Sequence, residues 1–324
     1  MKKAYKPLAL FLTIILLSSC WTESKFTEDR IAMGTSVSIT VFSRMDAKLL
    51  DGAFLLLSDI EREISAKDGN SYISKINNSA GIDSVAVPED VYILIERSLE
   101  LAKETDGLFN PAIGALVDLW GITTENPHVP DEAELSSVLP LLSLEDVILD
   151  DGQKTVFLAK RGMKLDLGGI GKGYAADKLR DYLSSNGVKR ALINLGGNVY
   201  ALGWKDESSE EKWRVGIVDP IDQSTMLTSV DVENKAVVTS GGYERYFEKD
   251  GVRYHHILDS KTGFPSDSDV LSATIVSSDS TLADALSTAV FSGGTEKAKE
   301  FADRFKVYVI VYTKAGEILR FGEL

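Results

Sequence analysis

The sequence predicts an α+β fold with mixed or antiparallel sheets and flanking helices. Strand-like runs outnumber helical runs in the second half of the chain. The two kinds of run do not alternate strictly, as they would in a doubly wound parallel sheet. The first half begins with one alternating strand and continues with amphipathic helices. Without a leader of 19 residues, about 305 residues remain, which suits one large domain or two intimately joined ones.

The first half contains one predicted strand and two predicted helices. Residues 35–42 alternate apolar and hydroxyl side chains, the pattern of a half-buried strand. Apolar side chains then recur at helical spacing over residues 50–64, and a second helix follows Pro88. Residues 121–151 are mixed, and the prolines and His128 within them indicate a loop.

The second half is dominated by short strands. A strand over residues 163–167 is expected to lead into a glycine-rich turn. Helical patterns cover residues 174–186, 282–291 and 296–305. The remaining apolar runs predict strands at 155–159, 191–195, 213–218, 236–240, 271–276 and 307–313.

The first 19 residues have the features of a signal peptide. Three lysines precede an apolar run over residues 8–17, which is too short to span a bilayer. The run ends in Leu17-Ser18-Ser19-Cys20, which resembles a bacterial lipobox, although an ordinary signal peptide could also end near a cysteine. Cys20 is the only cysteine, so an intramolecular disulfide and a cysteine-based metal site are excluded.

These features divide the chain into three parts. Residues 1–19 form the leader, residues 20–30 form a polar, aperiodic tether that begins at the lipidated Cys20, and residues 31–324 form the folded domain. Acyl chains on Cys20 would hold the protein at a membrane surface without spanning it.

The chain is strongly acidic, with 35 Lys and Arg against 49 Asp and Glu. Removal of residues 1–19 takes three lysines and no acid, which leaves a net charge of −17. Nucleic-acid binding needs clustered basic side chains and is not expected. A phosphate-bearing ligand must instead be received by backbone amides, by a local lysine or by a bound cation.

The densest chemical signal is the glycine-rich segment Asp166-Leu-Gly-Gly-Ile-Gly-Lys-Gly-Tyr-Ala-Ala-Asp177. Glycines let a phosphate approach the backbone, and the N-terminus of the following helix offers free N–H groups. Lys172 adds a positive charge. The spacing fits neither the dinucleotide fingerprint nor the P-loop. Taken alone, this segment could equally be a tight turn from strand to helix.

Asp284 and Thr288 lie four residues apart in a predicted helix, so their oxygens face the same side. A carboxylate and a hydroxyl at this spacing suit a hard cation such as Mg²⁺. An ordinary solvated helix face explains most such pairs.

His256 is the credible general base among the three histidines. His128 lies in the proline-flanked loop, and His255 should point to the opposite face of a strand from His256. A structural role for a histidine in such a strand is the common alternative. Glu244 and Arg245 most simply form a local ion pair.

Taken together, these segments closely resemble the ApbE family of flavin transferases. The likeness runs from residue 33 to residue 291. It rests on the motifs M-G-T, D-L-G-G-I-x-K-G-Y-A-A-D, I-N-L-G-G-N, S-G-x-Y-E-R-Y-F, H-I-x-D-x-x-T-G-x-P and D-A-L-S-T-A, in this order.

The resemblance implies a T-fold-like architecture and an activity. FAD is the expected substrate and Mg²⁺ the expected cofactor, and FMN passes to a Ser or Thr hydroxyl of an acceptor protein as AMP is released. The resemblance assigns FAD contacts to Met33, Asn110, Pro111, Ala112, Asp166, Lys172, His256 and Ile257. It assigns metal ligation to Asp284, Thr288 and a backbone carbonyl at Gly169, and His256 would take the hydroxyl proton.

Two positions depart from the family pattern. Lys67 stands where the family usually has an aromatic residue, so one stacking contact with the ligand is absent or supplied elsewhere. Ser260 replaces a frequent proline, which affects a turn rather than the chemistry.

Two other functions stay open at this point. Water could replace the protein hydroxyl, which makes the protein an FAD pyrophosphatase that yields FMN and AMP. The chain could also be a non-catalytic FAD-binding lipoprotein, although a pure binder has no need of the metal pair. The resemblance suggests acceptors in Rnf- or Nqr-type membrane redox complexes, and hence a periplasmic, membrane-anchored protein. The inner membrane is favoured, without a firm signal for the leaflet.

Overall fold

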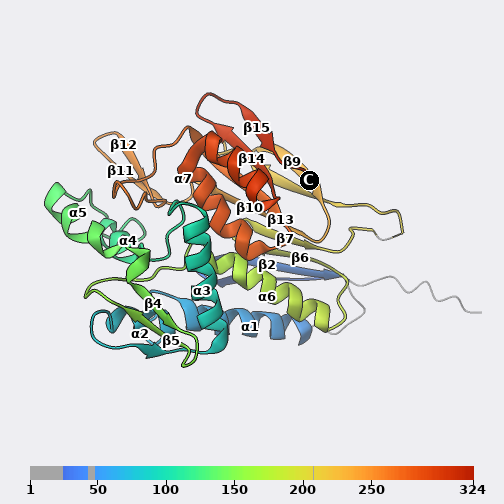
Figure 1. The fold of residues 1–324 in the computed structure, drawn as a ribbon. Coiled ribbons are helices and arrows are strands. Elements are labelled where there is room, and N and C mark those ends of the chain that lie inside the picture. Colours follow the sequence, from blue (N-terminus) through green and yellow to red (C-terminus); the bar gives the residue numbers. More distant parts are fainter. Residues whose placement is uncertain (1–24, 43–47, 207) are drawn as a thin grey trace, which may run out of the picture.

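An eight-stranded sheet forms the centre of the fold (Figure 1). The structure, a computed structural model, describes residues 25–42, 48–206 and 208–324. All neighbouring strands in the sheet pair antiparallel, in the spatial order β1-β2-β6-β7-β10-β13-β14-β15. Their bounds are β1 Lys25–Ala32, β2 Thr35–Phe42, β6 Arg190–Leu195, β7 Asn198–Leu202, β10 Lys235–Gly241, β13 Val270–Ser277, β14 Tyr308–Thr313 and β15 Ile318–Phe321.

Three smaller sheets complete the β structure. They are β3 Val85–Ala86 with β5 Thr155–Leu158 and β4 Val147–Asp150, the hairpin of β8 Trp213–Val218 and β9 Met226–Val232, and the hairpin of β11 Tyr246–Lys249 and β12 Val252–His255.

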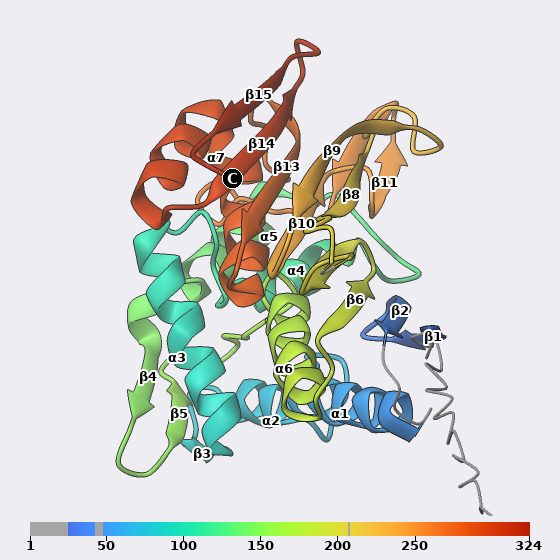
Figure 2. The same cartoon turned by 90° about the vertical axis from the view of Figure 1, so that its right-hand side faces the viewer.

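The longer helices gather on one side of the large sheet. Figure 2 shows α6 at the centre of this layer, with α1 below it and α7 above it. The helices are α1 Lys48–Ile64, α2 Tyr72–Asn78, α3 Glu89–Glu104, α4 Gly114–Trp120, α5 Glu132–Val138, α6 Gly171–Ser185 and α7 Ser280–Phe305, with short 3₁₀ turns η1 Leu139–Leu141 and η2 Leu144–Asp146.

Alternation along the central strands builds two cores. Successive side chains of a strand point to opposite faces of the sheet. In β10, Ala236 and Val238 join the main core with the helices, whereas Val237 joins a second core. The β8–β9 hairpin contributes Trp213 and neighbouring apolar residues to this second core. The sheet is therefore covered on both faces, by helices on one and by a hairpin on the other.

The predicted fold class is confirmed. The strand predictions match β2, β5, β6, β8, β10, β13 and β14, and the helical patterns match α1, α3, α6 and α7. The two predicted helices at 282–291 and 296–305 are continuous in α7 apart from a break at Gly294, where φ is 77° and ψ is −171°. Strands β11 and β12 escape prediction because their surfaces are largely exposed and carry no clear apolar alternation.

The strand predicted over residues 163–167 is wrong. This segment makes only an isolated bridge between Lys164 and Ile113. Its backbone is held by a side chain instead: Asn77 Nδ2 donates to Leu165 O (2.9 Å), and Leu165 N donates to Asn77 Oδ1 (2.7 Å). An apolar extended segment resembles a strand locally, whatever supplies its hydrogen-bond partners.

The tether predicted over residues 20–30 is also too long. Residues 25–30 belong to β1, which pairs with β2 along its whole length. This edge strand is rich in polar side chains, because only one of its faces is covered. The sequence pattern therefore does not predict it. Residues 1–24 lie outside the described residues, so the predicted leader and Cys20 stay predictions.

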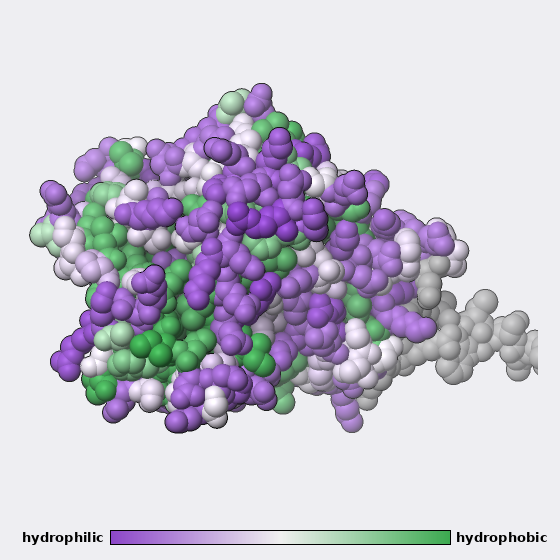
Figure 3. All heavy atoms as spheres, in the orientation of Figure 1, coloured by the Kyte–Doolittle hydropathy of each residue, from purple (hydrophilic) through white to green (hydrophobic). Residues whose placement is uncertain are grey.

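The mixed region 121–151 contains a helix that its sequence pattern does not predict. Asp131 and Glu134 form a capping box at the start of α5, with both reciprocal hydrogen bonds present. Figure 3 shows a mainly hydrophilic surface on which hydrophobic side chains gather in the left half of the view, the half that carries α4, α5, β4 and β5. Within the described residues, no helix has the length and apolar character needed to cross a membrane.

Candidate active site

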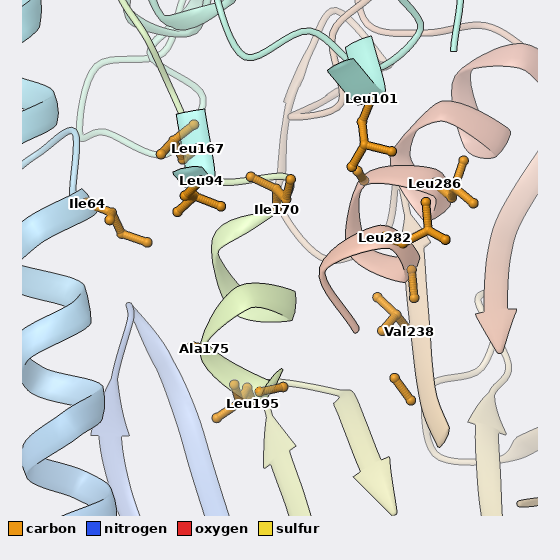
Figure 4. Close-up of a cluster of buried hydrophobic side chains, with 14 of the residues drawn as sticks. Ile64, Leu94, Leu101, Leu167, Ile170, Ala175, Leu195, Val238, Leu282 and Leu286 are labelled. Atoms are coloured by element: carbon orange, nitrogen blue, oxygen red, sulfur yellow. The ribbon is translucent and has the colours of Figure 1, made fainter. Parts of the chain in front are cut away.

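The glycine-rich segment is an anchored turn that leads directly into α6. Leu167 and Ile170 are buried and point into the main core, as Figure 4 shows. Gly168 between them is exposed, and its N–H donates to Asp166 Oδ1 (2.7 Å). α6 begins at Gly171, so Lys172 lies in its first turn. The apolar anchors fix the turn, and the glycine backbone is left open at the surface.

Asp284 of α7 lies against the N-terminal turn of α6. Its carboxylate is 3 % exposed and accepts hydrogen bonds from Gly173 N (2.9 Å, to Oδ2) and from Asn198 Nδ2 (2.9 Å, to Oδ1). Lys172 Nζ is 3.7 Å from Oδ1. A buried carboxylate is stable only when it is paired and hydrogen-bonded. Lys172 and the positive end of α6 supply that pairing.

The three residues assigned to the metal lie near one another. Asp284 and Thr288 lie on successive turns of α7, and a Cβ placed on Gly169 would be 3.4 Å from Thr288 Oγ1. One carboxylate, one hydroxyl and one carbonyl form a donor set that suits a hard cation such as Mg²⁺. The part of the chain that the structure describes holds no group of three or more His, Cys, Asp or Glu side chains that could bind a metal ion. A metal at this site would therefore depend on Asp284 as its charged protein ligand.

Asp166 begins the glycine-rich turn and is held by the segment that contains Asn110, Pro111 and Ala112. Asp166 N donates to Pro111 O (2.8 Å), and Asn110 Oδ1 accepts from Ala112 N (2.8 Å). Burial raises the pKa of Asp166, while the Gly168 N–H and the charge of Lys67 lower it. Lys67 thus lies on the Asp166 side of the site, where its Nζ also donates to Thr123 Oγ1 (3.0 Å).

His256 carries a neutral imidazole next to the β11–β12 hairpin. Its backbone N–H donates to Arg245 O (3.0 Å), and its ring nitrogen Nδ1 lies 3.2 Å from the same oxygen. A carbonyl oxygen only accepts, so Nδ1 carries the proton and Nε2 is the basic nitrogen. The pKa of His256 is lowered to about 4, mainly by burial of the ring. The hydrogen bond to the Arg245 backbone raises the pKa, and the charges of Arg245 and Lys172 lower it further.

The other two histidines lie elsewhere, as the sequence predicts. His255 Nε2 faces Ser266 O (3.1 Å), and its ring packs edge-on against Phe291. His128 lies beside Glu134 of α5, with 3.4 Å between Nε2 and Oε1. Neither ring is among the groups that surround Asp284.

Met33 lies in the turn of the β1–β2 hairpin, close to the start of α6. Its φ is 51° and that of Gly34 is 68°, the backbone pattern of a two-residue hairpin turn. The Met33 Cε atom is 3.7 Å from the Cβ position of Gly171. This predicted FAD contact therefore reaches the glycine-rich turn from β1 and β2.

Three of the predicted FAD contacts have buried side chains. Pro111, Ala112 and Ile257 lie in the protein interior, and Ile257 is 7 % exposed. Only backbone groups at these positions can face a ligand in this arrangement. The backbone carbonyl of Pro111, for example, accepts from Asp166 N.

Two members of the site are not identified by the sequence patterns. Asn198 belongs to a glycine turn in the sequence, yet its amide holds Asp284. Glu244 is expected from the sequence to pair with Arg245. Burial raises the pKa of Glu244. The charges of Lys172 and Arg245 lower this pKa, and the charge of Asp284 raises it. Glu244 therefore belongs to the same electrostatic cluster. No local pattern relates these residues, because they come from different elements.

A surface pocket of about 480 Å³ lies elsewhere, between α3, α6 and the start of α7. Its lining includes Asp90, Tyr174, Arg180 and Thr281, and none of the predicted FAD or metal contacts. The candidate site is thus defined by converging polar groups rather than by this pocket.

Comparisons with known proteins agree with the arrangement. Residues 33–311 match the ApbE family. The chain is 38% identical over 296 residues to an FAD:protein FMN transferase of Klebsiella pneumoniae (strain 342), covering 91% of each chain. It is 41% identical over 291 residues to an FAD:protein FMN transferase of Treponema pallidum (strain Nichols), covering 85% of this chain and 80% of that protein.

Solved structures show the same fold. The crystal structure of the ApbE protein from Thermotoga maritima MSB8 matches with a TM-score of 0.86 and 36% identity, covering 92% of this chain and 97% of that one. The flavin transferase ApbE from Vibrio cholerae matches with a TM-score of 0.82 and 26% identity over the same shares. The motifs, the fold and these matches lead to one conclusion: the chain belongs to the ApbE family.

Proposed function

We propose that this protein transfers FMN from FAD to a Ser or Thr hydroxyl of an acceptor protein and releases AMP. The observation that carries the proposal is the convergence of Gly169, Lys172, Asp284 and Thr288 at the start of α6. The two relatives described above, 38% and 41% identical over the aligned residues, are FAD:protein FMN transferases. The convergence supplies what a pyrophosphate needs in an acidic protein: amides, one cation and oxygen donors for a metal.

Each residue has a role in this proposal. The exposed glycine backbone and the first turn of α6 receive the pyrophosphate, and Lys172 neutralises part of its charge. Asp284, Thr288 and the Gly169 carbonyl would hold Mg²⁺, which supplies Lewis-acid polarisation of the phosphoryl oxygens when bound. Asp166 and Met33 flank the turn and orient the ligand.

The transfer is a displacement at phosphorus. The acceptor hydroxyl oxygen forms a bond to the FMN-side phosphorus of FAD, and the bond from that phosphorus to the bridging oxygen breaks. AMP leaves with the bridging oxygen and its electron pair. The hydroxyl proton passes to Nε2 of His256. This nitrogen carries no proton at physiological pH, because the imidazole is neutral. A bound protein hydroxyl has an advantage over water because its position is fixed before reaction.

A pyrophosphatase reaction uses the same binding groups and differs only in the nucleophile. A non-catalytic FAD carrier is less consistent with the site, because storage of FAD does not require the oxygen donors on α7.

The cellular setting is part of the same proposal. A lipid on Cys20 would place the domain at a bacterial membrane facing the periplasm, with the inner membrane favoured. Acceptors in membrane redox complexes of the Rnf or Nqr type are consistent with that setting.

The decisive experiment incubates the protein with FAD, Mg²⁺ and a purified acceptor with a Ser/Thr-containing flavinylation segment. Mass spectrometry should show the acceptor with one added FMN, and chromatography should show AMP in equal amount. An acceptor with the hydroxyl residue changed to Ala is the control and should stay unlabelled. Free FMN that forms at the same rate with and without acceptor would make the protein a pyrophosphatase.

A further inference from the structure

Helices α6 and α7 cap each other through two carboxylates. Asp284 of α7 accepts the Gly173 N–H in the first turn of α6 (2.9 Å). In return, Asp177 of α6 accepts from the first residues of α7: Ser280 N (3.1 Å), Thr281 N (2.8 Å) and Thr281 Oγ1 (2.7 Å). The N-terminal N–H groups of a helix have no partner within the helix, so each carboxylate satisfies donors of the other helix.

The first turns of the two helices are also in close contact. A Cβ on Gly173 would lie 2.2 Å from Ser280 O and 2.7 Å from the Asp284 Cβ. No side chain fits between them, so a small shift of α7 is felt directly at the start of α6. Two hydrogen-bonded carboxylates and one close contact thus determine how the helices meet.

Asp177 is itself held in place. Arg180 Nη1 donates to Asp177 Oδ1 (2.6 Å) and to Ser278 O (3.2 Å), just before α7. The Asp177 side chain is 15% exposed. Its carboxylate is fixed on both sides, by Arg180 within α6 and by the start of α7.

The donors of the site follow on the same face of α7. Thr281 precedes Asp284 by three residues and Thr288 by seven, a spacing that returns to the same helix face. The rotation and the axial position of α7 at Thr281 therefore determine where the Asp284 carboxylate and the Thr288 hydroxyl lie.

We propose that Asp177 is a positioning residue for the Asp284–Thr288 donor pair. By capping α7 through Thr281, it holds both donors against the glycine-rich turn. This inference rests on the proposed function, because it concerns the metal that those donors would hold. Mutation of a residue that orients a metal ligand typically lowers metal affinity or activity by about 10–100-fold.

The experiment measures the Mg²⁺ concentration that half-saturates FAD binding to the full-length protein without acceptor. Quenching of flavin fluorescence reports binding, in samples where chromatography shows FAD still intact. Asp177→Asn should raise that concentration roughly 10-fold, with FAD affinity in the absence of Mg²⁺ unchanged. Asp181→Asn is the matched control and should leave the value unchanged, because Asp181 pairs with the same Arg180 (2.8 Å) but does not cap α7.

Two variants of Thr281 separate positioning from general stability. Thr281→Ser keeps the hydroxyl donor and should behave as wild type, whereas Thr281→Val removes it and should shift the Mg²⁺ dependence in the same direction as Asp177→Asn. If Asp177→Asn does not fold, the two Thr281 variants test the inference on their own. Equal half-saturating Mg²⁺ concentrations for Thr281→Ser and Thr281→Val would overturn it.

The remaining outcomes are distinct. A wild-type protein that binds FAD equally with and without Mg²⁺ overturns both the metal assignment and this inference. A Mg²⁺-dependent wild type with an unchanged Asp177→Asn value overturns this inference alone and leaves the proposed function intact.

Discussion

At the scale of single residues, His256 shows how the fold selects one form of a side chain. The Arg245 carbonyl accepts from the backbone N–H of His256 and from its ring Nδ1–H, which leaves Nε2 as the basic nitrogen. Burial keeps the ring neutral across physiological pH. Such a ring can accept a proton from a hydroxyl without first losing one.

Replacement of His256 tests its role in proton transfer. His256→Ala should lower the transfer rate by roughly 10²–10⁴-fold, with only a modest change in FAD affinity, because the glycine-rich turn and the first turn of α6, which are assigned to the pyrophosphate, stay intact. The rate of FMN labelling and the FAD dissociation constant should be measured on the same samples. A fall in affinity that matches the fall in rate would make His256 a binding residue instead.

The charge state of His256 can be observed directly by its NMR titration. The native imidazole should stay neutral as the pH falls through 6.5 and take up a proton only near pH 4. Because its pKa is lowered on folding, the unfolded chain binds more protons between these values, so this group destabilises the folded state increasingly as pH falls below 6.5. His256→Gln assigns the signal, and a native midpoint near 6.5 would contradict the buried, neutral ring.

Asp284 and Thr288 should differ in importance. Asp284→Asn keeps the shape but removes the charged donor assigned to the metal, so Mg²⁺-dependent AMP release should be abolished. Thr288→Val deletes one neutral donor and should reduce the rate less. AMP formation at several Mg²⁺ concentrations measures both. Asp284→Asn with the wild-type Mg²⁺ response would show that the metal binds elsewhere.

At the scale of secondary-structure elements, the α6–α7 contact is the feature that assembles the site. The two helices are separated by more than ninety residues of chain that include four strands of the large sheet. They meet where Gly173 allows Ser280 and Asp284 to approach the backbone of α6. The glycine at 173 therefore serves helix packing, whereas the exposed Gly168 opens the backbone to a ligand.

Gly173→Ala tests this packing role. A Cβ at that position would lie 2.2 Å from Ser280 O, so the helices must separate, at a cost of about 1–3 kcal/mol. Chemical denaturation measures the loss of unfolding free energy. Gly69→Ala is the matched control: its Cβ position has no heavy atom within 4 Å, and a change within about 0.5 kcal/mol is expected. Equal stability of the two variants would refute the close contact.

At the scale of the whole molecule, the start of the fold constrains where the protein can act. β1 begins at Lys25, so four residues separate it from Cys20. A chain spans at most about 3.6 Å per residue. If Cys20 is lipidated, the start of β1 stays within about 18 Å of the attachment point at the membrane surface. This distance favours acceptors that are themselves bound to the membrane.

Cys20→Ala tests the proposed anchor. Without the acylated thiol, the protein should move from the membrane fraction to the soluble fraction or accumulate with its leader uncleaved. Fractionation followed by mass spectrometry of the N-terminal peptide distinguishes these results. Purified Cys20→Ala protein should label a soluble acceptor at the wild-type rate, since Cys20 precedes the fold. A variant that stays fully acylated and membrane-bound would contradict the lipid assignment.

Features that depend on neighbouring residues are predictable from the amino-acid sequence. Apolar alternation predicts β2, because a half-buried strand shows its two faces in every pair of residues. Short apolar runs predict β8, β10, β13 and β14. The spacing of Asp284 and Thr288 places both donors on one helix face. The glycine-rich motif and its companions indicate the ApbE family from the order of their residues alone.

The surroundings of those donors depend on the tertiary structure. Asn198 holds Asp284 across 86 positions of sequence, and Asp177 caps α7 across 103 and 104. Pairing with β2 makes residues 25–30 the edge strand β1 rather than a tether, and the distant Asn77 holds residues 163–167 as a segment outside the sheets. Local patterns record which faces of a segment are buried. They do not record which distant donor satisfies a given carboxylate, because packing of the whole chain brings those partners together.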